Sequence, residues 1–198
     1  MRETKKQRSV PAKKVRWYQV KITLMGLPIW RRLLVREDMS LGLLHAVIQV
    51  AMGWTNSHLH HFIIGQNRYS DPQFDGGFDF GAPPDLDEGK ITLAEAAPRV
   101  KAKFLYEYDF GDSWVHTITV EKILEPEAAP KGVAECIGGE RACPPEDCGG
   151  IGGYADLLKI IKNPKHKEHE TMLEWLGGGF DPEAFDIEDI NKYLKKLK

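Results

Sequence analysis

Alternating apolar and polar positions mark much of the first two thirds of the chain as β-structure. Apolar side chains fall on every second residue between 17 and 25, and the pattern returns at 29–36 after a turn that contains Gly and Pro. This period is typical of half-buried strands, so the two segments predict an antiparallel hairpin. Residues 101–124 predict a second hairpin around a tight turn at 111–113. A histidine-rich strand is expected at 58–64.

The apolar period changes to that of helices in other parts of the chain. Residues 40–52 predict a helix with Ser40 as its N-cap. Three further helices are predicted after residue 150, at 154–162, 165–176 and 185–197. Strands that come first and helices that come last favour an α+β fold. We therefore expect a single domain with a mostly antiparallel sheet, built from β-hairpins, and helices packed against it.

Two stretches show no long periodic pattern. Residues 67–90 predict an irregular loop, followed by a short helix that Thr92 caps. The Gly- and Pro-rich segment 136–154 also predicts a loop without regular structure. Within it, Glu146 and Asp147 are interpreted as acidic residues at the N-terminus of the following helix.

The charge distribution limits the kinds of partner. The whole chain has a net charge of −2, residues 1–16 carry +6 and residues 192–198 carry +4, so residues 17–191 carry −12. We interpret residues 1–15 as a disordered basic arm before a domain at 16–198. The acidic body excludes sequence-specific DNA binding, and the arm alone predicts weak, non-specific contact with nucleic acid. Without a signal sequence or a long apolar run, we expect a cytoplasmic protein outside the membrane.

Three cysteines lie within 13 residues of one another in the 136–154 segment. Their C-x6-C-x4-C spacing is looser than that of zinc knuckles. If the loop holds an ion, the donors predict structural zinc bound by Cys136, Cys143 and Cys148, with His58 or His60 as the fourth ligand. The alternative is three reduced thiols that act as small apolar groups.

Asp109, Asp112 and His116 are candidate catalytic residues, because a carboxylate can orient an imidazole and a second one can bind a metal. A structural interpretation is open for each of them. His116 shares a strand face with apolar residues, and residues 109–112 suit a β-turn in which Asp bonds the backbone and Gly111 takes positive φ. His45 is expected to be a hydrogen-bonded histidine of the core.

Several motifs together resemble the plasmid pRiA4b ORF-3-like family. They span about residues 16–186 and include LPIWRR at 27–32, HLHHF at 58–62, YEYDFGDSWVH at 106–116, GERACPPEDCGG at 139–150 and FDPEAF at 180–185. The resemblance implies a single α+β domain and a link to mobile elements. It implies no catalytic residues, because the family has no established ones.

The function expected from these observations is that of a non-enzymatic binding or interaction module. Each candidate catalytic group also has a structural explanation, and this favours the module. The alternative is a metal-dependent hydrolase or nucleic-acid-processing enzyme that uses Asp109, Asp112, His116 and the histidine strand. A solvent-open cleft lined by these side chains would favour the enzyme, and burial of His116 would favour the module.

Overall fold

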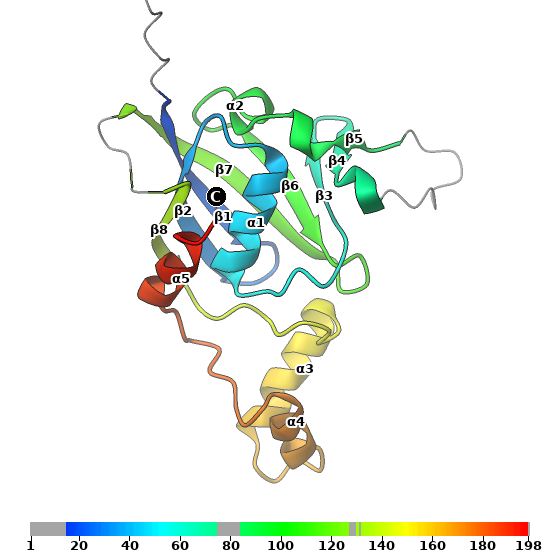
Figure 1. Ribbon diagram of the computed structural model, residues 1–198. Helices are drawn as coiled ribbons and strands as arrows, with labels where there is room; N and C mark the ends of the chain where they lie inside the picture. Colours follow the sequence, from blue (N-terminus) through cyan, green and yellow to red (C-terminus); the bar gives the residue numbers. More distant parts are fainter. Residues whose placement is uncertain (1–14, 75–83, 127–129, 131, 198) are drawn as a thin grey trace, which may run out of the picture.

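The two predicted hairpins lie side by side in one sheet. The computed structural model describes residues 15–74, 84–126, 130 and 132–197. Strand β1 (Trp17–Leu24) pairs with both β2 (Trp30–Arg36) and β7 (Trp114–Leu124), and β7 pairs with β6 (Lys103–Tyr108). All these pairs are antiparallel. The predicted α+β domain with a mostly antiparallel sheet is confirmed (Figure 1).

Further strands extend this sheet to eight, in the order β5-β4-β3-β6-β7-β1-β2-β8. On one side, β3 (His60–Ile64) pairs with β6, followed by β4 (Asn67–Ser70) and a parallel β5 (Leu86–Asp87). On the other side, β8 (Ala134–Glu140) pairs with β2. The prediction of irregular structure is thus wrong for β8, which contains Cys136, and for the β4 and β5 strands.

Helix α1 (Leu41–Met52) covers one face of the sheet (Figure 1). It begins where the Ser40 hydroxyl accepts a hydrogen bond from the Leu43 amide, and it ends at Gly53, whose φ of 89° is left-handed. Its buried side meets the inward residues of the strands, and burial alternates as predicted along most of β1, β2, β6 and β7. The core contains, among others, Val20, Ile22, Leu33, Leu44, Ile48, Phe62, Tyr106, Trp114 and Ile118.

The remaining helices are shorter. They are α2 (Leu93–Ala96), α3 (Gly150–Lys162), α4 (His169–Trp175) and α5 (Ile187–Leu194), together with the 3-10 turns η1 (Pro72–Phe74) and η2 (Glu88–Lys90). Thr92 caps α2 with a full capping box, as its sequence predicts. None of the helices in the described residues combines the length and apolar character needed to cross a membrane.

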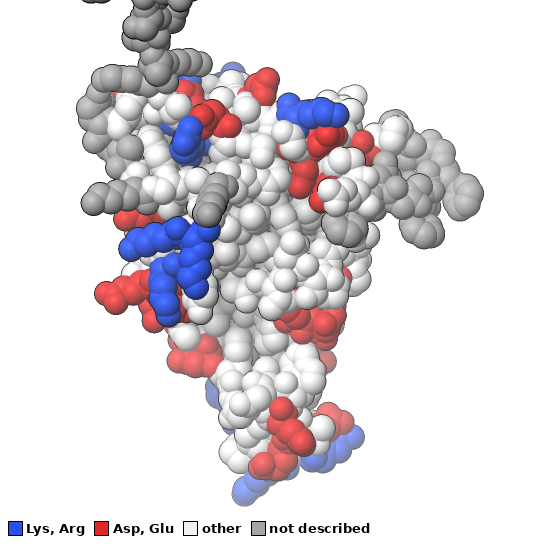
Figure 2. Space-filling model, viewed as in Figure 1, with Lys and Arg blue, Asp and Glu red and all other residues white. Residues whose placement is uncertain are grey.

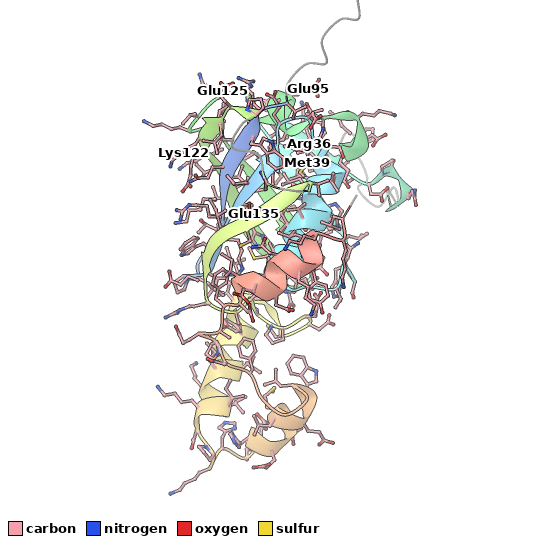
Figure 3. All side chains as sticks on the ribbon, turned by 60° about the vertical axis from the view of Figure 1, so that its left-hand side comes forward. Arg36, Met39, Glu95, Lys122, Glu125 and Glu135 are labelled. Atoms are coloured by element: carbon pink, nitrogen blue, oxygen red, sulfur yellow. The ribbon has the colours of Figure 1, made fainter. Side chains whose placement is uncertain are left out.

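The three C-terminal helices do not all lie on the sheet. Helix α5 lies against β8 and α1 (Figure 3). In contrast, α3 and α4 pack on each other and extend away from the sheet (Figure 1), although we expected both to cover it. The N-terminal half of α3 still reaches the core, where Tyr154 and Leu157 are buried. Residues 1–14, most of the proposed basic arm, lie outside the described residues.

A buried guanidinium joins several of these elements. Arg31 of β2 is only 3% exposed and donates hydrogen bonds to the carbonyl oxygens of Ala51 in α1 and Glu140 in β8, at 2.8 and 2.9 Å. Its Nη2 lies 3.6 Å from Cys143 Sγ, and its guanidinium stacks at 5.0 Å on the Phe185 ring. One side chain therefore connects the sheet, the end of α1 and the segment that leads to α3.

We predict that Arg31→Met lowers the free energy of unfolding by about 2–4 kcal/mol, because at least two buried carbonyls lose their donor. Urea denaturation measures this change. Arg36→Met is the matched control, because the Arg36–Asp38 ion pair is exposed and such pairs contribute less than about 1 kcal/mol. Arg36 lies at the end of the sheet remote from α3 and α4 (Figure 3). Equal losses in the two variants would contradict the proposed role of Arg31.

Candidate functional site

Three short segments meet at the end of the sheet from which α3 and α4 extend. They are residues 54–58 after α1, the β6–β7 turn at 109–113 and the loop at 143–149 before α3. Trp54 links them, because its indole Nε1 donates to the Pro144 carbonyl at 2.9 Å and its ring stacks on Tyr108 at 5.0 Å. The functional side chains of this region are therefore held between the sheet and the α3 entry loop.

Glu146 is fixed by hydrogen bonds from the other two segments. Its Oε1 accepts from the Thr55 amide at 2.8 Å and from the Tyr108 hydroxyl at 3.0 Å. The Tyr108 hydroxyl also accepts from the Ser57 amide at 3.0 Å. Burial raises the pKa of Tyr108, with Glu146 adding to the rise, so the phenol stays protonated and can donate to the carboxylate.

The turn between β6 and β7 holds Asp109 in place. Asp109 Oδ1 accepts from the Gly111 and Asp112 amides at 2.9 and 3.3 Å, which is the predicted turn contact. In this turn Asp109 and Ser113 have left-handed backbones, with φ of 57° and 54°. The expected positive φ at Gly111 is wrong, because Gly111 is not among the left-handed residues. Asp109 Oδ2 lies toward His58, in the segment after α1.

His58 stands at the centre of three carboxylates. Its Nε2 lies 3.1 Å from Asp147 Oδ1, 3.7 Å from Asp109 Oδ2 and 3.9 Å from Glu146 Oε2. One ligand atom from each of His58, Asp109 and Asp147 lies within 4.8 Å of the others. In the described part of the chain, His58 lies within 4 Å of all three carboxylates, and no Lys or Arg pairs with them. We call these four residues the His58 cluster.

The other catalytic candidates have structural contacts. Asp112 Oδ2 accepts from the Gly149 amide at 3.1 Å and so connects the turn to the start of α3. His116 is fully buried, with its ring 5.4 Å from Trp54 and 5.5 Å from Tyr106. The structure thus brings Asp109 to His58 and leaves His116 inside the core.

The predicted zinc ligands lie apart in the structure. No three of Cys136, Cys143, Cys148, His58 and His60 have ligand atoms within 4.8 Å of one another. Cys143 Sγ lies 3.1 Å from Met52 Sδ, and burial raises the pKa of Cys143 to about 11 and that of Cys148 to about 12. This geometry gives a four-ligand thiol site no support, and zinc at the thiols stays a prediction.

His60 belongs to a separate buried network. Its Nε2 lies 2.8 Å from Glu88 Oε2, and its ring stacks on His45 with the centroids 3.4 Å apart. His45 also contacts the Tyr106 hydroxyl and Asn56 Oδ1, both at 2.8 Å, as expected of a hydrogen-bonded core histidine. Burial, with the nearby His60, lowers the pKa of His45 to about 3. His58 and His60 are two residues apart but lie in different networks: His58 beside Asp147, and His60 beside Glu88 and His45.

A pocket of about 490 Å³ lies beside the His58 cluster. It lies between the end of α1, the loop before α3 and the end of α4. Apolar and aromatic residues line it together with two acids; the lining includes Trp54, Pro144, Glu146, Asp147, Trp175 and Phe180. Figure 2 shows acidic side chains where the body of the protein narrows toward α3 and α4, and a group of basic side chains over α5.

His58 and Asp109 are recognisable as candidates from the sequence, but their partners are not. Glu146 and Asp147, which the sequence suggests as acids at a helix N-terminus, lie beside His58, and Gly149 is the N-cap of α3. The adjacent acids after two prolines were the available signal. Trp54 and Trp175 carried no signal of their own, because a pocket forms only when residues distant in sequence pack together.

The burial of His116 predicts a pH-dependent stability. Burial lowers the pKa of His116 to about 4, whereas an unfolded histidine titrates near 6.5. The unfolded chain therefore binds the proton first, so stability falls as pH falls from about 6.5 and this loss ends near pH 4. His116→Gln should reduce the slope of unfolding free energy against pH by up to about 1.4 kcal/mol per unit in this window.

Urea denaturation between pH 4 and 8 measures that slope. His166→Gln is the matched control, because His166 lies in the connection between α3 and α4 outside the core, and it should keep the wild-type slope. A His116→Gln slope equal to that of the wild type would show that the buried imidazole is not the titrating group.

In the first turn of α3, the packing around Gly152 and Gly153 predicts that alanine at these two positions has different effects on stability. A methyl group at Gly153 would overlap the backbone carbonyl of Cys148, whereas one at Gly152 would meet no atom within 4 Å. Gly153→Ala should therefore lower the free energy of unfolding by about 1–3 kcal/mol. Gly152→Ala should leave it unchanged or raise it by up to about 1 kcal/mol, because Ala favours helices. Thermal unfolding that ranks the two variants in the opposite order would contradict the described packing.

Comparisons with known proteins agree with the fold. The family model of plasmid pRiA4b ORF-3-like proteins matches residues 16–189. Uncharacterized protein y4hQ of Sinorhizobium fredii is 35% identical over 185 residues, which cover 90% of this chain and 91% of the relative. The crystal structure of a protein of unknown function, MM3350 from Methanosarcina mazei Go1, has a TM-score of 0.74 and 34% identity, covering 88% of this chain and 96% of that one. The chain therefore belongs to the plasmid pRiA4b ORF-3-like family.

Proposed function

We propose that this chain is a non-enzymatic binding module that receives a cationic side chain of a partner protein in the pocket beside the His58 cluster. The observation that carries the proposal is the combination of aromatic walls and carboxylates in one pocket of about 490 Å³. Indole and phenyl rings attract Lys and Arg cations through their π faces. Trp175 and Phe180 supply such rings, and Glu146 and Asp147 supply negative charge.

The charge of the site supports the same kind of ligand. Asp109, Glu146 and Asp147 surround one imidazole and pair with no Lys or Arg among the described residues. Even with His58 protonated, the His58 cluster carries an excess of negative charge. A cationic group from outside would relieve this repulsion, and an anionic phosphate would increase it. The ligand class is therefore a basic segment of a protein, not a nucleic acid.

Two groups of the predicted catalytic set argue against catalysis. His116 is fully buried and cannot reach a substrate, and one oxygen of Asp112 is engaged by the Gly149 amide. A cytoplasmic location and a link to mobile elements form part of this proposal. The three free cysteines support a reducing compartment, and the family description supports a plasmid context.

A metal-dependent hydrolase or nucleic-acid-processing enzyme is the second candidate. The convergence of His58, Asp109 and Asp147 next to an open pocket favours it, because a metal held there could activate water. Hydrolysis of bis(p-nitrophenyl) phosphate with added Mn²⁺ or Zn²⁺ distinguishes the two. Turnover that Asp147→Asn abolishes would support the enzyme over the binding module.

Trp175 gives the sharpest test of the binding module, because its side chain lines the pocket and is half exposed. Octalysine and octaarginine peptides should bind the wild-type chain, while octaglutamate should not. Trp175→Ala should weaken this binding by about threefold to thirtyfold, which corresponds to a cation–π contribution of about 0.5–2 kcal/mol. Isothermal titration calorimetry measures the dissociation constants.

Tyr193→Ala is the matched control, because Tyr193 is an aromatic residue of similar exposure on α5, outside the pocket. It should leave the dissociation constants unchanged. Loss of binding in the control as large as that in Trp175→Ala, or no binding of either basic peptide to the wild-type chain, would refute the proposal.

A further inference from the structure

We propose that His58, Asp109 and Asp147 bind one divalent transition-metal ion, with Zn²⁺ or Mn²⁺ as the class of ion. This site shares Asp147 with the pocket of the proposed function, and a bound ion would offset negative charge that the proposed function uses. The two proposals are therefore tested on the chain with and without the ion. The three ligands come from three different segments, so the fold and not a local sequence motif creates the site.

The distances suit a shared ion. A zinc ion with bonds of 2.0–2.1 Å in a tetrahedral shell places its ligand atoms about 3.3 Å apart. His58 Nε2 lies 3.1 Å from Asp147 Oδ1 and 3.7 Å from Asp109 Oδ2. All three ligand atoms lie within 4.8 Å of one another, so small side-chain rotations would bring them around one ion.

One buried polar atom at this place lacks a hydrogen bond. His58 Nε2 is inaccessible to solvent and has no hydrogen-bond partner of suitable geometry, although carboxylates lie close by. The Asp109 side chain is 9% exposed; its Oδ1 accepts the turn amides, and its Oδ2 lies 3.7 Å from His58 Nε2. An unpaired buried nitrogen is costly, and a metal bond would satisfy it.

Backbone amides hold the carboxylates of Asp109 and Glu146 in fixed orientations. Oδ1 of Asp109 is occupied by the turn, which fixes the carboxylate so that the second oxygen points toward His58. Glu146 lies next to the three ligands, with Oε2 at 3.9 Å from His58 Nε2, while its Oε1 is held by Thr55 and Tyr108. Hydrogen-bonded carboxylates of this kind orient metal sites in proteins.

The donor set selects the class of ion. One imidazole with two carboxylates suits Zn²⁺ or Mn²⁺ better than Ca²⁺, which prefers oxygen ligands alone. Three protein ligands leave at least one coordination position for water or for a group of a bound partner. A divalent ion would also offset most of the negative charge of Asp109, Glu146 and Asp147, which no Lys or Arg of the described chain balances.

The test is metal binding by full-length protein that was purified without a metal-affinity tag and treated with EDTA. Equilibrium dialysis against Zn²⁺ or Mn²⁺, followed by elemental analysis, should give one ion per chain. Asp147→Asn and His58→Gln should each weaken binding by at least about tenfold. Asp147 is the safer variant for folding, because its side chain is 70% exposed. Circular dichroism checks that each variant is folded.

Two controls separate this site from the thiols and from general surface charge. Asp156→Asn removes an exposed carboxylate of α3, and Cys148→Ala removes the thiol next to Asp147 in sequence. Both should bind the ion as the wild-type chain does. The proposal is overturned if the wild type binds neither ion at about 100 µM, if Asp147→Asn and His58→Gln bind with wild-type affinity, or if only the cysteine variant loses the ion. Peptide binding is measured on the EDTA-treated chain without added metal, so failure of one proposal does not decide the other.

Discussion

The hydrogen bonds of the buried Arg31 guanidinium hold β2, the end of α1 and the segment before α3 together. No carboxylate within 4 Å neutralises it among the described residues; backbone carbonyl oxygens of Trp30, Ala51 and Glu140 accept its hydrogen bonds instead. Ala51 lies in the last turn of α1, where the helix dipole places partial negative charge. A buried cation without such partners would be strongly unfavourable, so these elements are held in one arrangement.

The His58 cluster follows from that arrangement. Arg31 contacts Cys143, and the next residue, Pro144, accepts the hydrogen bond of Trp54 from the end of α1. The loop then continues directly to Glu146 and Asp147. Three residues of the site, Asn56, Asp109 and Asp147, have left-handed backbones with φ of 57°. Such conformations are uncommon outside glycine and persist where surrounding contacts enforce them, as at binding and catalytic sites.

The sheet was predictable because its hairpins follow a strict period of two. The inward face of β7, with Trp114, His116 and Ile118, has the burial that the alternation indicates. Strand β8 was missed because glycines and charged residues weaken its pattern, and its pairing with β2 decides its structure. The orientation of α3 and α4 was missed for a different reason. Their apolar periodicity identifies a buried face, but it does not say whether that face meets the sheet or another helix.

The site could be predicted only in part. His58 and Asp109 were recognised as metal-binding or catalytic residue types, but their meeting depends on contacts between the 54–58, 109–113 and 143–149 segments. The cysteine cluster gave the stronger signal in sequence, because its members are close along the chain. In the folded chain Cys136 lies in β8, with its backbone bonded to the Asn191 side chain, and Cys143 packs against Met52. Proximity in sequence was therefore a poor guide to proximity in space.

If the folded chain forms a cation site at the His58 cluster, anomalous diffraction at the zinc edge from crystals of the full chain grown with Zn²⁺ should reveal it. We expect a strong anomalous peak about 2.0–2.1 Å from His58 Nε2, with carboxylate oxygens of Asp109 and Asp147 as further ligands. A peak at the thiols of Cys136, Cys143 or Cys148, with none at His58, would contradict this expectation.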